Sequence, residues 1–228
     1  MTPQELFALH PFLGSLTADE TLELLRHAHV RRLPAGRIVF RKDDPGDGLY
    51  GVLSGRIVVS VESVSGKELI LNMFGPGEFF GEIALLDGKG RTATATAREP
   101  SVLLFLGRAD FLPFLARRPA ASARIICLLC ARLRRTTDLV EDSAFFGVPT
   151  RLAKQLVGLA GRYGGLDAAS SVHTLRISQA ELARTLGVSR EIVSRQLAVW
   201  REAGILRLAR GQVAVKDMRA LQGIIAGG

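Results

Sequence analysis

Between Val30 and Leu106 the sequence consists of short runs of β-forming residues divided by glycines. The runs read RIVF, LYGVL, RIVVSVE, ELILNMF, ATATA and SVLLFL, and glycines stand at 36, 46, 48, 55, 66, 75, 77, 88 and 90. Short strands at regular spacing with glycine turns are typical of antiparallel barrels and rolls. The segment therefore predicts an antiparallel β-roll, with a hairpin in GDGLYGVLSGRIVVS that turns at Ser54–Gly55.

Helical patterns flank this segment on both sides. Residues 2–28 predict helices interrupted by Pro11 and Gly14, and the second of these helices starts with Thr17 and Glu20 in capping-box spacing. From Asp110 the apolar period becomes helical again. After Pro119 one long helix is expected to run to about residue 144.

Apolar residues on this long helix step by three and four, as in a heptad seam. The seam residues are Ile126, Leu129, Leu133, Thr136 and Val140. Two interpretations remain open: the helix packs on its own roll, or it pairs with a second copy in a dimer.

Phe145–Pro149 predicts a hinge, because Gly147 can end one helix and Pro149 suits the first turn of the next. TRLAKQLVGLAGRYG then predicts an amphipathic helix, followed by a loop to about Leu175. The expected division is residues 1–109 for the β-roll, 110–146 for the long helix and hinge, and 147–228 for a third part.

The third part contains ISQAELARTLGVSREIVSRQLAVWREAGIL, which predicts a helix-turn-helix. Ser178 caps the first helix with Glu181 completing a capping box, Gly187 makes the turn, and Ser189 caps the second helix, which ends near residue 203. ILRLARGQVAV predicts a two-stranded wing that turns at Arg210–Gly211.

The second helix has the composition of a DNA-reading helix. Its polar N-terminal side holds Arg190, Glu191, Ser194 and Arg195, whereas Ile192, Val193, Leu197 and Trp200 offer apolar contacts elsewhere. Arginine donates two hydrogen bonds to guanine, and a glutamate accepts from the amino group of cytosine. The alternative is a solvated helix face with charge pairs.

Charge supports a nucleic-acid partner for the last third of the chain. The whole chain carries +8, but residues from Gly147 onward hold 12 Lys and Arg against 5 Asp and Glu, a net +7. The preceding residues hold 18 against 17, a net +1. A basic region next to a neutral one favours a polyanionic partner, although many basic surfaces only keep a protein in solution.

Glu82 and Arg91, in GEFFGEIALLDGKGRTATATA, are charges inside apolar surroundings. They suit a cyclic nucleotide, because Arg91 can hold a phosphate while Glu82 accepts from a ribose 2′-hydroxyl. Gly81 with the amides of Ile83 and Ala84 allows close approach of the phosphate, and Thr92 adds a hydroxyl. An internal Glu82–Arg91 salt bridge explains the spacing equally well.

With these motifs in place, residues 10 to 220 resemble the Crp/Fnr family of bacterial transcription regulators, and in particular its cyclic AMP receptor protein branch. FGEIALLDGKGRTATA resembles the family's phosphate-binding cassette, and SREIVSRQL resembles its recognition helix. The resemblance implies an α+β fold: an N-terminal antiparallel, jelly-roll-like β-roll that binds cyclic nucleotide, flanking helices, a long dimerisation helix and a C-terminal winged helix-turn-helix.

The resemblance also assigns roles to residues. It implies ribose and phosphate contacts from the cassette, purine contacts from a Thr pair on the long helix of the two subunits, and base contacts from the recognition helix, on half-sites similar to TGTGA. The expected nucleotide-binding residues are Gly81, Glu82, Ile83, Ala84, Arg91, Thr92, Thr136 and Thr137, and the expected DNA-binding residues are Ser178, Gln179, Ser189, Arg190, Glu191, Ser194 and Arg195.

Two departures concern the purine. The interval from Glu82 to Arg91 is one residue shorter than in the enteric receptor, as in cyclic-nucleotide-dependent kinases. Position 92 is Thr where the receptor has Ser, and in the kinases Thr there accompanies preference for cyclic GMP. The expected effector is cAMP, with cGMP as the alternative.

The remaining features argue against other branches and classes. Cys127 and Cys130 complete no zinc or iron–sulfur site and are expected in the core, while His27 and His29 are expected at the surface, so no metal, cluster or haem is predicted. The chain lacks a long apolar run and a leader-like start, which predicts a cytoplasmic protein without a membrane partner.

The predicted function is a homodimeric, ligand-gated transcription regulator, an activator that recruits RNA polymerase. One rival is an effector-independent DNA-binding protein with a vestigial cassette. Another is a cyclic-nucleotide phosphodiesterase, which the sequence disfavours because it has no metal cluster or nucleophile–base set. The third is a signalling subunit with a protein partner, which the winged helix disfavours.

Overall fold

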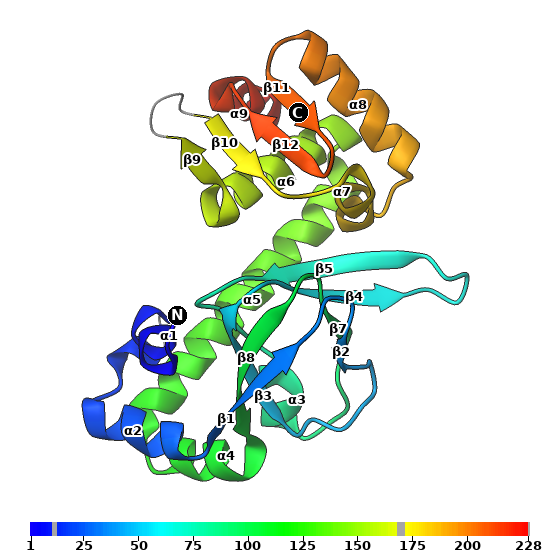
Figure 1. Ribbon diagram of the computed structural model, residues 1–228. Coiled ribbons are helices and arrows are strands. Elements are labelled where there is room, and N and C mark those ends of the chain that lie inside the picture. Colours follow the sequence, from blue (N-terminus) through cyan, green and yellow to red (C-terminus); the bar gives the residue numbers. More distant parts are fainter. Residues whose placement is uncertain (11–12, 168–171, 228) are drawn as a thin grey trace. The chain divides into compact units, whose positions relative to one another are not determined.

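The computed structural model describes residues 1–10, 13–167 and 172–227 of the 228-residue chain. The chain divides into two compact units, one of residues 1–66 and 71–134 and the other of residues 67–70 and 135–228. Helix α5, Pro119–Phe145, is continuous from the first unit into the second (Figure 1).

The first unit contains two four-stranded antiparallel sheets, as the glycine-divided runs predict. One sheet has the order β1-β8-β3-β6, formed by Ala28–Leu33, Ser101–Gly107, Gly48–Ser54 and Phe79–Phe80. The other has the order β2-β7-β4-β5, formed by Ile38–Phe40, Thr94–Ala97, Ile57–Glu62 and Glu68–Phe74.

The predicted hairpin at Ser54–Gly55 is wrong. Strand β3 pairs with β8 and β6, whereas β4 pairs with β7, so Gly55 carries the chain from one sheet to the other. β3 is a central strand, almost continuously buried, and both of its edges are already occupied. Gly55 has φ 84°, and a Cβ there would lie 2.3 Å from Ser101 Oγ, so the crossing needs glycine.

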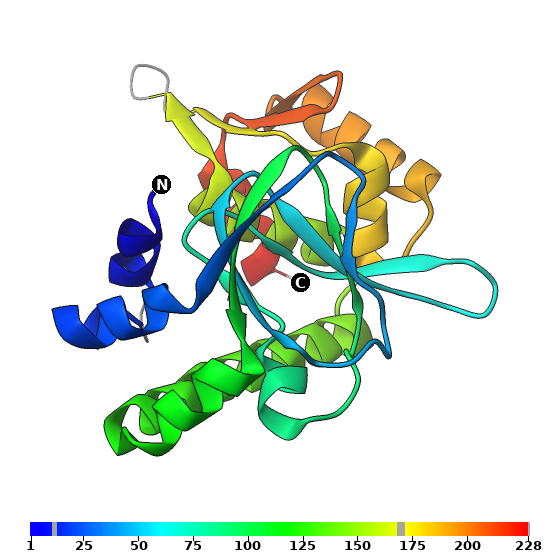
Figure 2. The same ribbon diagram turned by 60° about the horizontal axis from the view of Figure 1, so that its bottom comes forward.

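Strand β8 supplies both cores of this unit, because alternate residues of a strand point to opposite faces. Leu103 and Phe105 belong to an aromatic-rich cluster shared by the two sheets. Leu104 and Leu106 belong to a second cluster with residues of the helices. Those helices are α1, Pro3–Leu9, α2, Ala18–Arg26, and α4, Arg108–Ala116, and they lie to one side of the strands with α5 (Figure 2).

The helix caps follow the sequence signals. The capping box of Thr17 and Glu20 is formed as predicted, and Thr2 with Glu5 forms another at the start of α1. A short helix that the sequence did not reveal, α3, spans Glu82–Asp87. His27 and His29 are exposed, as predicted.

The predicted long helix is present, but its exposed line is shifted from the expected seam. Ala121 and Ile125 are buried and Leu129 packs against the core of the first unit. The exposed line instead runs through Ile126, Cys130, Leu133, Thr137 and Val140. Leu129 was expected on the seam, but it packs against the core of the first unit instead.

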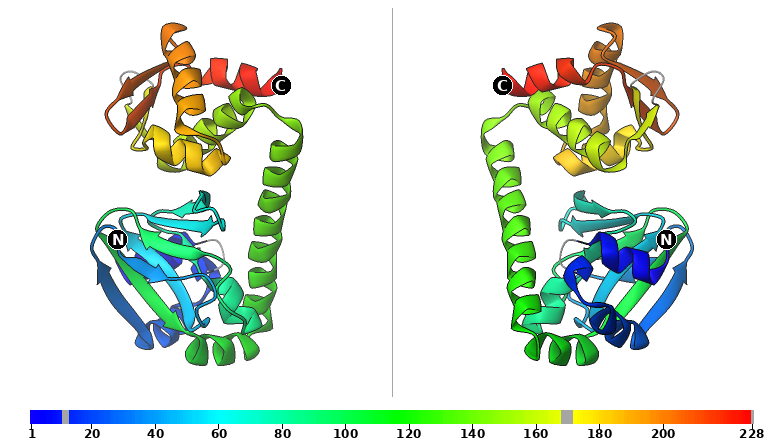
Figure 3. Two further views of the ribbon diagram at one scale, coloured as in Figure 1. Left: turned by 90° about the vertical axis from the view of Figure 1, so that its right-hand side faces the viewer. Right: turned by 90° about the vertical axis from the view of Figure 1, so that its left-hand side faces the viewer.

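In the second unit, α5 is followed by α6, Val148–Tyr163 (Figure 3). Pro149 lies in the first turn of α6, as predicted. The expected loop after α6 contains two strands, β9, Gly165–Asp167, and β10, Val172–Leu175, and residues 168–171 of that loop lie outside the described part. These strands extend the wing into a sheet of order β11-β12-β10-β9, with Leu206–Ala209 and Gln212–Val215 as the predicted wing. A final helix, α9, Met218–Ala226, contacts α6 and was not predicted.

Candidate functional site

The cassette of residues 79–92 is built around two left-handed glycines. Strand β6 ends at Phe80, Gly81 has φ 87° and caps α3, and Gly88 has φ 73° and ends it. A Cβ on Gly81 would lie 2.7 Å from Nη1 of Arg91, so a side chain there would displace the guanidinium. Glycine is therefore needed at position 81 both for the backbone conformation and for the space it leaves to Arg91.

Arg91 is only 2% exposed, and its guanidinium is held mainly by backbone oxygens. Nη1 donates to the carbonyl of Gly81 at 2.7 Å, and Nη2 donates to the carbonyl of Gly48 at 2.7 Å. Nη2 also pairs with Oδ1 of Asp47 at 2.5 Å, and Asp47 keeps half of its side chain exposed. The guanidinium carbon lies 4.2 Å from the ring centroid of Phe40. Arg91 is thus a preoriented, buried cation whose paired carboxylate is accessible to solvent.

Glu82 is 5% exposed and pairs with a residue that sequence reasoning missed. Its Oε1 accepts from Nη1 of Arg132 on α5, and Nη2 of Arg132 donates to the carbonyl of Phe79 at 2.5 Å. Its other oxygen, Oε2, is buried and has no hydrogen-bond partner in the part of the chain that is described. An unsatisfied carboxylate oxygen in a buried site is costly unless something donates to it.

These contacts correct the interpretation of Glu82 and Arg91 as one internal salt bridge. Arg91 pairs with Asp47, and Glu82 pairs with Arg132. The two charges that are nine residues apart in sequence therefore have different partners. Of the missed residues, Arg132 could have been found as a cation one turn before Thr136, but nothing in the local sequence marks Asp47.

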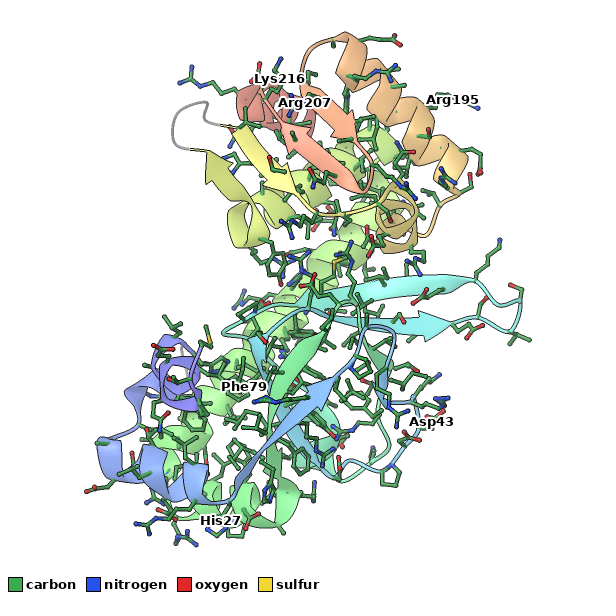
Figure 4. All side chains as sticks on the ribbon, in the orientation of Figure 1. His27, Asp43, Phe79, Arg195, Arg207 and Lys216 are labelled. Carbon is green, nitrogen blue, oxygen red and sulfur yellow. The ribbon has the colours of Figure 1, made fainter. Side chains whose placement is uncertain are left out.

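A buried histidine of the N-terminal segment, His10, lies next to Glu82 and Arg132. His10 lies with its ring centroid 4.8 Å from that of Phe79, which Figure 4 labels among the strands of the first unit. His10, Glu82 and Arg132 line the same cavity of about 20 Å³. Burial, together with the positive charge of Arg132, lowers the pKa of His10 to about 4. His10 is therefore neutral near pH 7.

Of the other predicted nucleotide-binding residues, Ala84 on α3 is buried at 2% exposure, and the remaining four are exposed. Ile83 on α3 is 42% exposed, and Thr92 next to Arg91 is exposed. Thr136 and Thr137 are exposed on α5, and Thr137 belongs to the exposed line of that helix. The structure thus gathers Gly81, Glu82 and Arg91 around one cassette and leaves the Thr pair at the surface.

The predicted helix-turn-helix is present in the second unit. Helix α7, Gln179–Leu186, begins with the predicted capping box, in which Ser178 Oγ accepts from the amide of Glu181 at 3.2 Å. Gly187 closes the helix with φ 67°, as expected for the tight turn. Helix α8, Arg190–Glu202, follows from Ser189, which stands at the N-cap but whose side chain makes no capping hydrogen bond to the backbone.

The predicted base-reading residues share one face of α8. Arg190, Glu191, Ser194 and Arg195 line a shallow hollow together with Ala198, and Figure 4 labels Arg195 on the outward side of the helix. The opposite face is buried through Val193, Leu197 and Trp200. Ile192 is 43% exposed, so it is not part of this buried face.

Hydrogen bonds at the start of α8 lower the pKa of the Glu191 carboxyl group. A backbone hydrogen bond within Glu191, one from Ser189 and the nearby charge of Arg190 lower the pKa of its carboxyl group. Wing residues Arg207 and Lys216, also labelled in Figure 4, are exposed and add positive charge to this unit. The face of α8 therefore presents two guanidinium groups and one carboxylate to solvent.

The cysteines do not have the core role expected of them, because Cys127 and Cys130 are both exposed on α5. No group of three or more His, Cys, Asp or Glu side chains in the described residues could hold a metal ion. Within the same residues, each helix is too short or too polar to cross a lipid bilayer.

Comparison with known proteins matches both units. The cyclic nucleotide-binding domain family matches residues 30–118, and the Crp-like helix-turn-helix domain family matches residues 150–224.

Two curated relatives are 35% identical to the chain. The CRP-like cAMP-activated global transcriptional regulator of Mycobacterium tuberculosis aligns over 188 residues, 82% of this chain and 84% of the relative. The cyclic AMP receptor protein of Thermus thermophilus aligns over 217 residues, 95% and 97% of the two chains.

Solved structures agree with this assignment. The global regulator CLP of Xanthomonas campestris, described as c-di-GMP responsive, superposes with a TM-score of 0.74 at 30% identity, over 87% of this chain and 99% of that one. The M. tuberculosis relative is named as a transcriptional regulator, and CLP is named as a global regulator of gene expression. The chain belongs to the Crp/Fnr family and is a cyclic-nucleotide-binding transcription regulator with a helix-turn-helix for DNA.

Proposed function

We propose that this regulator is gated by cAMP bound at the cassette. It acts as a homodimer in the cytoplasm, binds a palindrome with TGTGA-like half-sites and activates transcription by recruiting RNA polymerase. The observation that carries the effector site is a pair of buried charges: Arg91, whose carboxylate partner Asp47 is half exposed, and Glu82, whose Oε2 has no donor among the described residues.

Arg91 suits a single negative charge. The carbonyls of Gly48 and Gly81 fix its guanidinium, and among the described residues Asp47 supplies the negative charge that compensates it. A cyclic phosphate carries the same charge as Asp47, so it can replace this carboxylate without unbalancing the buried site. The exposure of Asp47 lets water solvate its carboxylate after displacement. Thr92 and the amides of Ile83 and Ala84 then add donors for the phosphate oxygens.

Glu82 suits a ribose hydroxyl. Arg132 satisfies Oε1, which leaves Oε2 to accept from the 2′-hydroxyl. Because carboxylates accept and do not donate, the site selects a donor at this point. A ribonucleotide fits this requirement, and a deoxyribonucleotide does not.

Arg132 connects the nucleotide site to the long helix. It lies on α5 one turn before Thr136, and it holds both Glu82 and the carbonyl of Phe79. In the second unit, Lys154 on α6 pairs with Asp142 near the end of α5 at 2.5 Å. Nucleotide that engages Glu82 and the Thr pair can therefore bias α5, and the hinge at Phe145–Pro149 can re-aim α8. The nucleotide can shift the equilibrium between the two orientations of α8 only by the difference between its binding free energies for them.

Two other nucleotides, cGMP and c-di-GMP, are candidates for the effector. Thr92 stands where Thr accompanies preference for cGMP in the kinases that the cassette resembles. The X. campestris relative is described as responsive to c-di-GMP, but this dinucleotide has two phosphates and the cassette buries one arginine. Cyclic AMP is favoured because two 35%-identical relatives are named for it.

For DNA, the exposed set of Arg190, Glu191 and Arg195 supports base reading in the major groove. A homodimer would present two such helices to half-sites one DNA turn, about 34 Å, apart.

Calorimetric titration with cAMP, cGMP and c-di-GMP tests the effector. Wild type is compared with Arg91→Gln and with Arg37→Gln, a matched change at an exposed arginine of the same unit, and circular dichroism checks that each variant folds. We expect binding of cAMP by wild type and Arg37→Gln, and its loss in folded Arg91→Gln. Tighter binding of either other nucleotide would reassign the effector, and no binding of any would leave an effector-independent DNA-binding protein.

A further inference from the structure

One face of α5 is exposed along most of the helix. Ile126, Leu133 and Val140 on this face are 60%, 68% and 64% exposed. Cys130 and Thr137 lie between them and are exposed as well. The five residues step by four and three, which is the spacing of the core positions in a two-stranded coiled coil. We name this line of residues the α5 stripe.

The α5 stripe is distinct from the face that α5 buries in its own chain. Ala121 and Ile125 are buried there, and Leu129 packs against the same core. The helix therefore has two apolar faces, and the residues that the structure describes bury one of them and leave the other exposed. Exposed aliphatic side chains at heptad spacing suit a second copy of this helix, because each position then packs against the same position of its partner.

Cys130 lies in the middle of the stripe, between Ile126 and Leu133. In a two-fold pair of parallel helices, a residue at a core position faces its own copy. Packed helix axes are about 8–10 Å apart and each Cα lies about 2.3 Å from its axis, so facing Cα atoms approach to about 3.4–5.4 Å, which overlaps the range for a disulfide. Disulfides join Cα atoms about 4.4–6.8 Å apart. The thiols of two Cys130 residues are thus within bonding range.

Cys127 provides an internal comparison. It lies three residues before Cys130, which places it about 60° around the helix from Cys130 and off the stripe. Two Cys127 residues would sit on the flanks of the pair, directed away from the axis between the helices. Both cysteines are exposed in the single chain. A difference in their ability to form a disulfide between chains would therefore come from the pairing of the two helices.

We propose that Cys130 forms a disulfide with Cys130 of a second copy, which closes the regulator into a covalent dimer when a peroxide is present. This inference rests on the proposed homodimer. One Cys130 thiolate attacks a peroxide oxygen, which breaks the O–O bond, releases water or an alcohol and leaves a sulfenic acid. The second thiolate attacks that sulfur, the S–S bond forms and the hydroxyl leaves as water. In total, two thiols lose two protons and two electrons to one peroxide.

A covalent dimer has a consequence for DNA binding. Non-covalent copies separate on dilution, whereas the disulfide keeps the two recognition helices in one molecule. Oxidised protein therefore retains DNA affinity at concentrations where reduced protein dissociates.

The experiment treats full-length wild type, Cys127→Ser and Cys130→Ser with hydrogen peroxide and separates them by electrophoresis without reductant. Wild type and Cys127→Ser give a band at twice the chain mass that dithiothreitol removes, and Cys130→Ser gives none. Light scattering of the reduced proteins reports whether they are dimers.

Each other outcome overturns the proposal. A covalent dimer from Cys130→Ser, or loss of the covalent dimer in Cys127→Ser, would show that the disulfide does not join two Cys130 residues. A reduced dimer without a covalent band means that the copies pair through another register or face, with the proposed homodimer intact. A reduced monomer removes the homodimer itself.

Discussion

Removal of one hydroxyl from the nucleotide tests the role of Glu82. Its Oε2 is buried and has no donor among the described residues, whereas Oε1 is already held by Arg132. The 2′-hydroxyl of cAMP supplies the missing donor. In 2′-deoxy-cAMP that donor is absent, and the carboxylate oxygen stays desolvated in the complex.

The expected cost follows from the burial of the acceptor. A hydrogen bond to a charged group contributes about 1.5–3 kcal/mol, and Glu82 is only 5% exposed, so solvent screens little of it. Since about 1.4 kcal/mol is tenfold in affinity, cAMP should bind roughly 10- to 150-fold more tightly than 2′-deoxy-cAMP.

Calorimetric titration of both nucleotides gives this ratio directly. Glu82→Ala serves as the control, because the ratio should fall toward one when the acceptor is missing, even if both affinities drop. Equal affinity of the two nucleotides for wild type would refute the ribose role of Glu82. A ratio that Glu82→Ala leaves unchanged would place the 2′-hydroxyl elsewhere.

Four further changes probe the site, the fold and the DNA face. Asp47→Asn removes the charge that compensates Arg91, so urea unfolding of the free protein should show a loss of about 1–2 kcal/mol, while calorimetry shows tighter cAMP binding; unchanged affinity would mean that Asp47 does not compete with phosphate. The pKa of His10 is about 4 in the folded protein against 6.5 ordinarily, so the unfolded chain binds the extra proton below pH 6.5. The free energy of unfolding should then fall by about 2 kcal/mol between pH 7.5 and pH 5, and this pH dependence should be absent in His10→Gln. Asp43 has φ 70°, so Asp43→Gly should increase the free energy of unfolding by up to about 1 kcal/mol and raise the thermal midpoint. A lower midpoint would contradict backbone strain at this position. Arg190→Ala should cost roughly 1–3 kcal/mol on specific DNA, and an equal loss on random DNA in anisotropy titrations would argue against base reading.

The elements with local signals were predictable from the sequence. Capping boxes at Thr17 and Ser178, the left-handed Gly187 and the wing turn at Gly211 each depend on residues within a few positions of one another. The roll was predictable as a class because its strands are short and divided by glycines.

What failed depends on contacts between distant residues. Ser54–Gly55 has the composition of a hairpin turn, yet pairing of β3 with β8, some 50 residues away, decides the course of the chain. Similarly, Glu82 meets Arg132 and Arg91 meets Asp47 across separations of 50 and 44 residues. The strands β9 and β10 form by extending the wing sheet, which their own sequence does not signal.

The three–four spacing of apolar residues did not determine which face of α5 packs against its own chain. The contacts with the core of the first unit determine it. Leu129 and Cys130 are adjacent in sequence and both fit a three–four pattern. Only the packing of Leu129 on the first unit shows that Cys130 belongs to the exposed line.

The most direct test of the central claim measures DNA affinity with and without nucleotide. Fluorescence anisotropy of a labelled TGTGA palindrome is titrated with wild-type protein, with and without saturating cAMP. The account predicts that cAMP tightens DNA binding about 5- to 150-fold, the usual range of coupling between sites. An unchanged dissociation constant, with nucleotide binding verified by calorimetry on the same sample, would show that the cassette does not gate the helix-turn-helix.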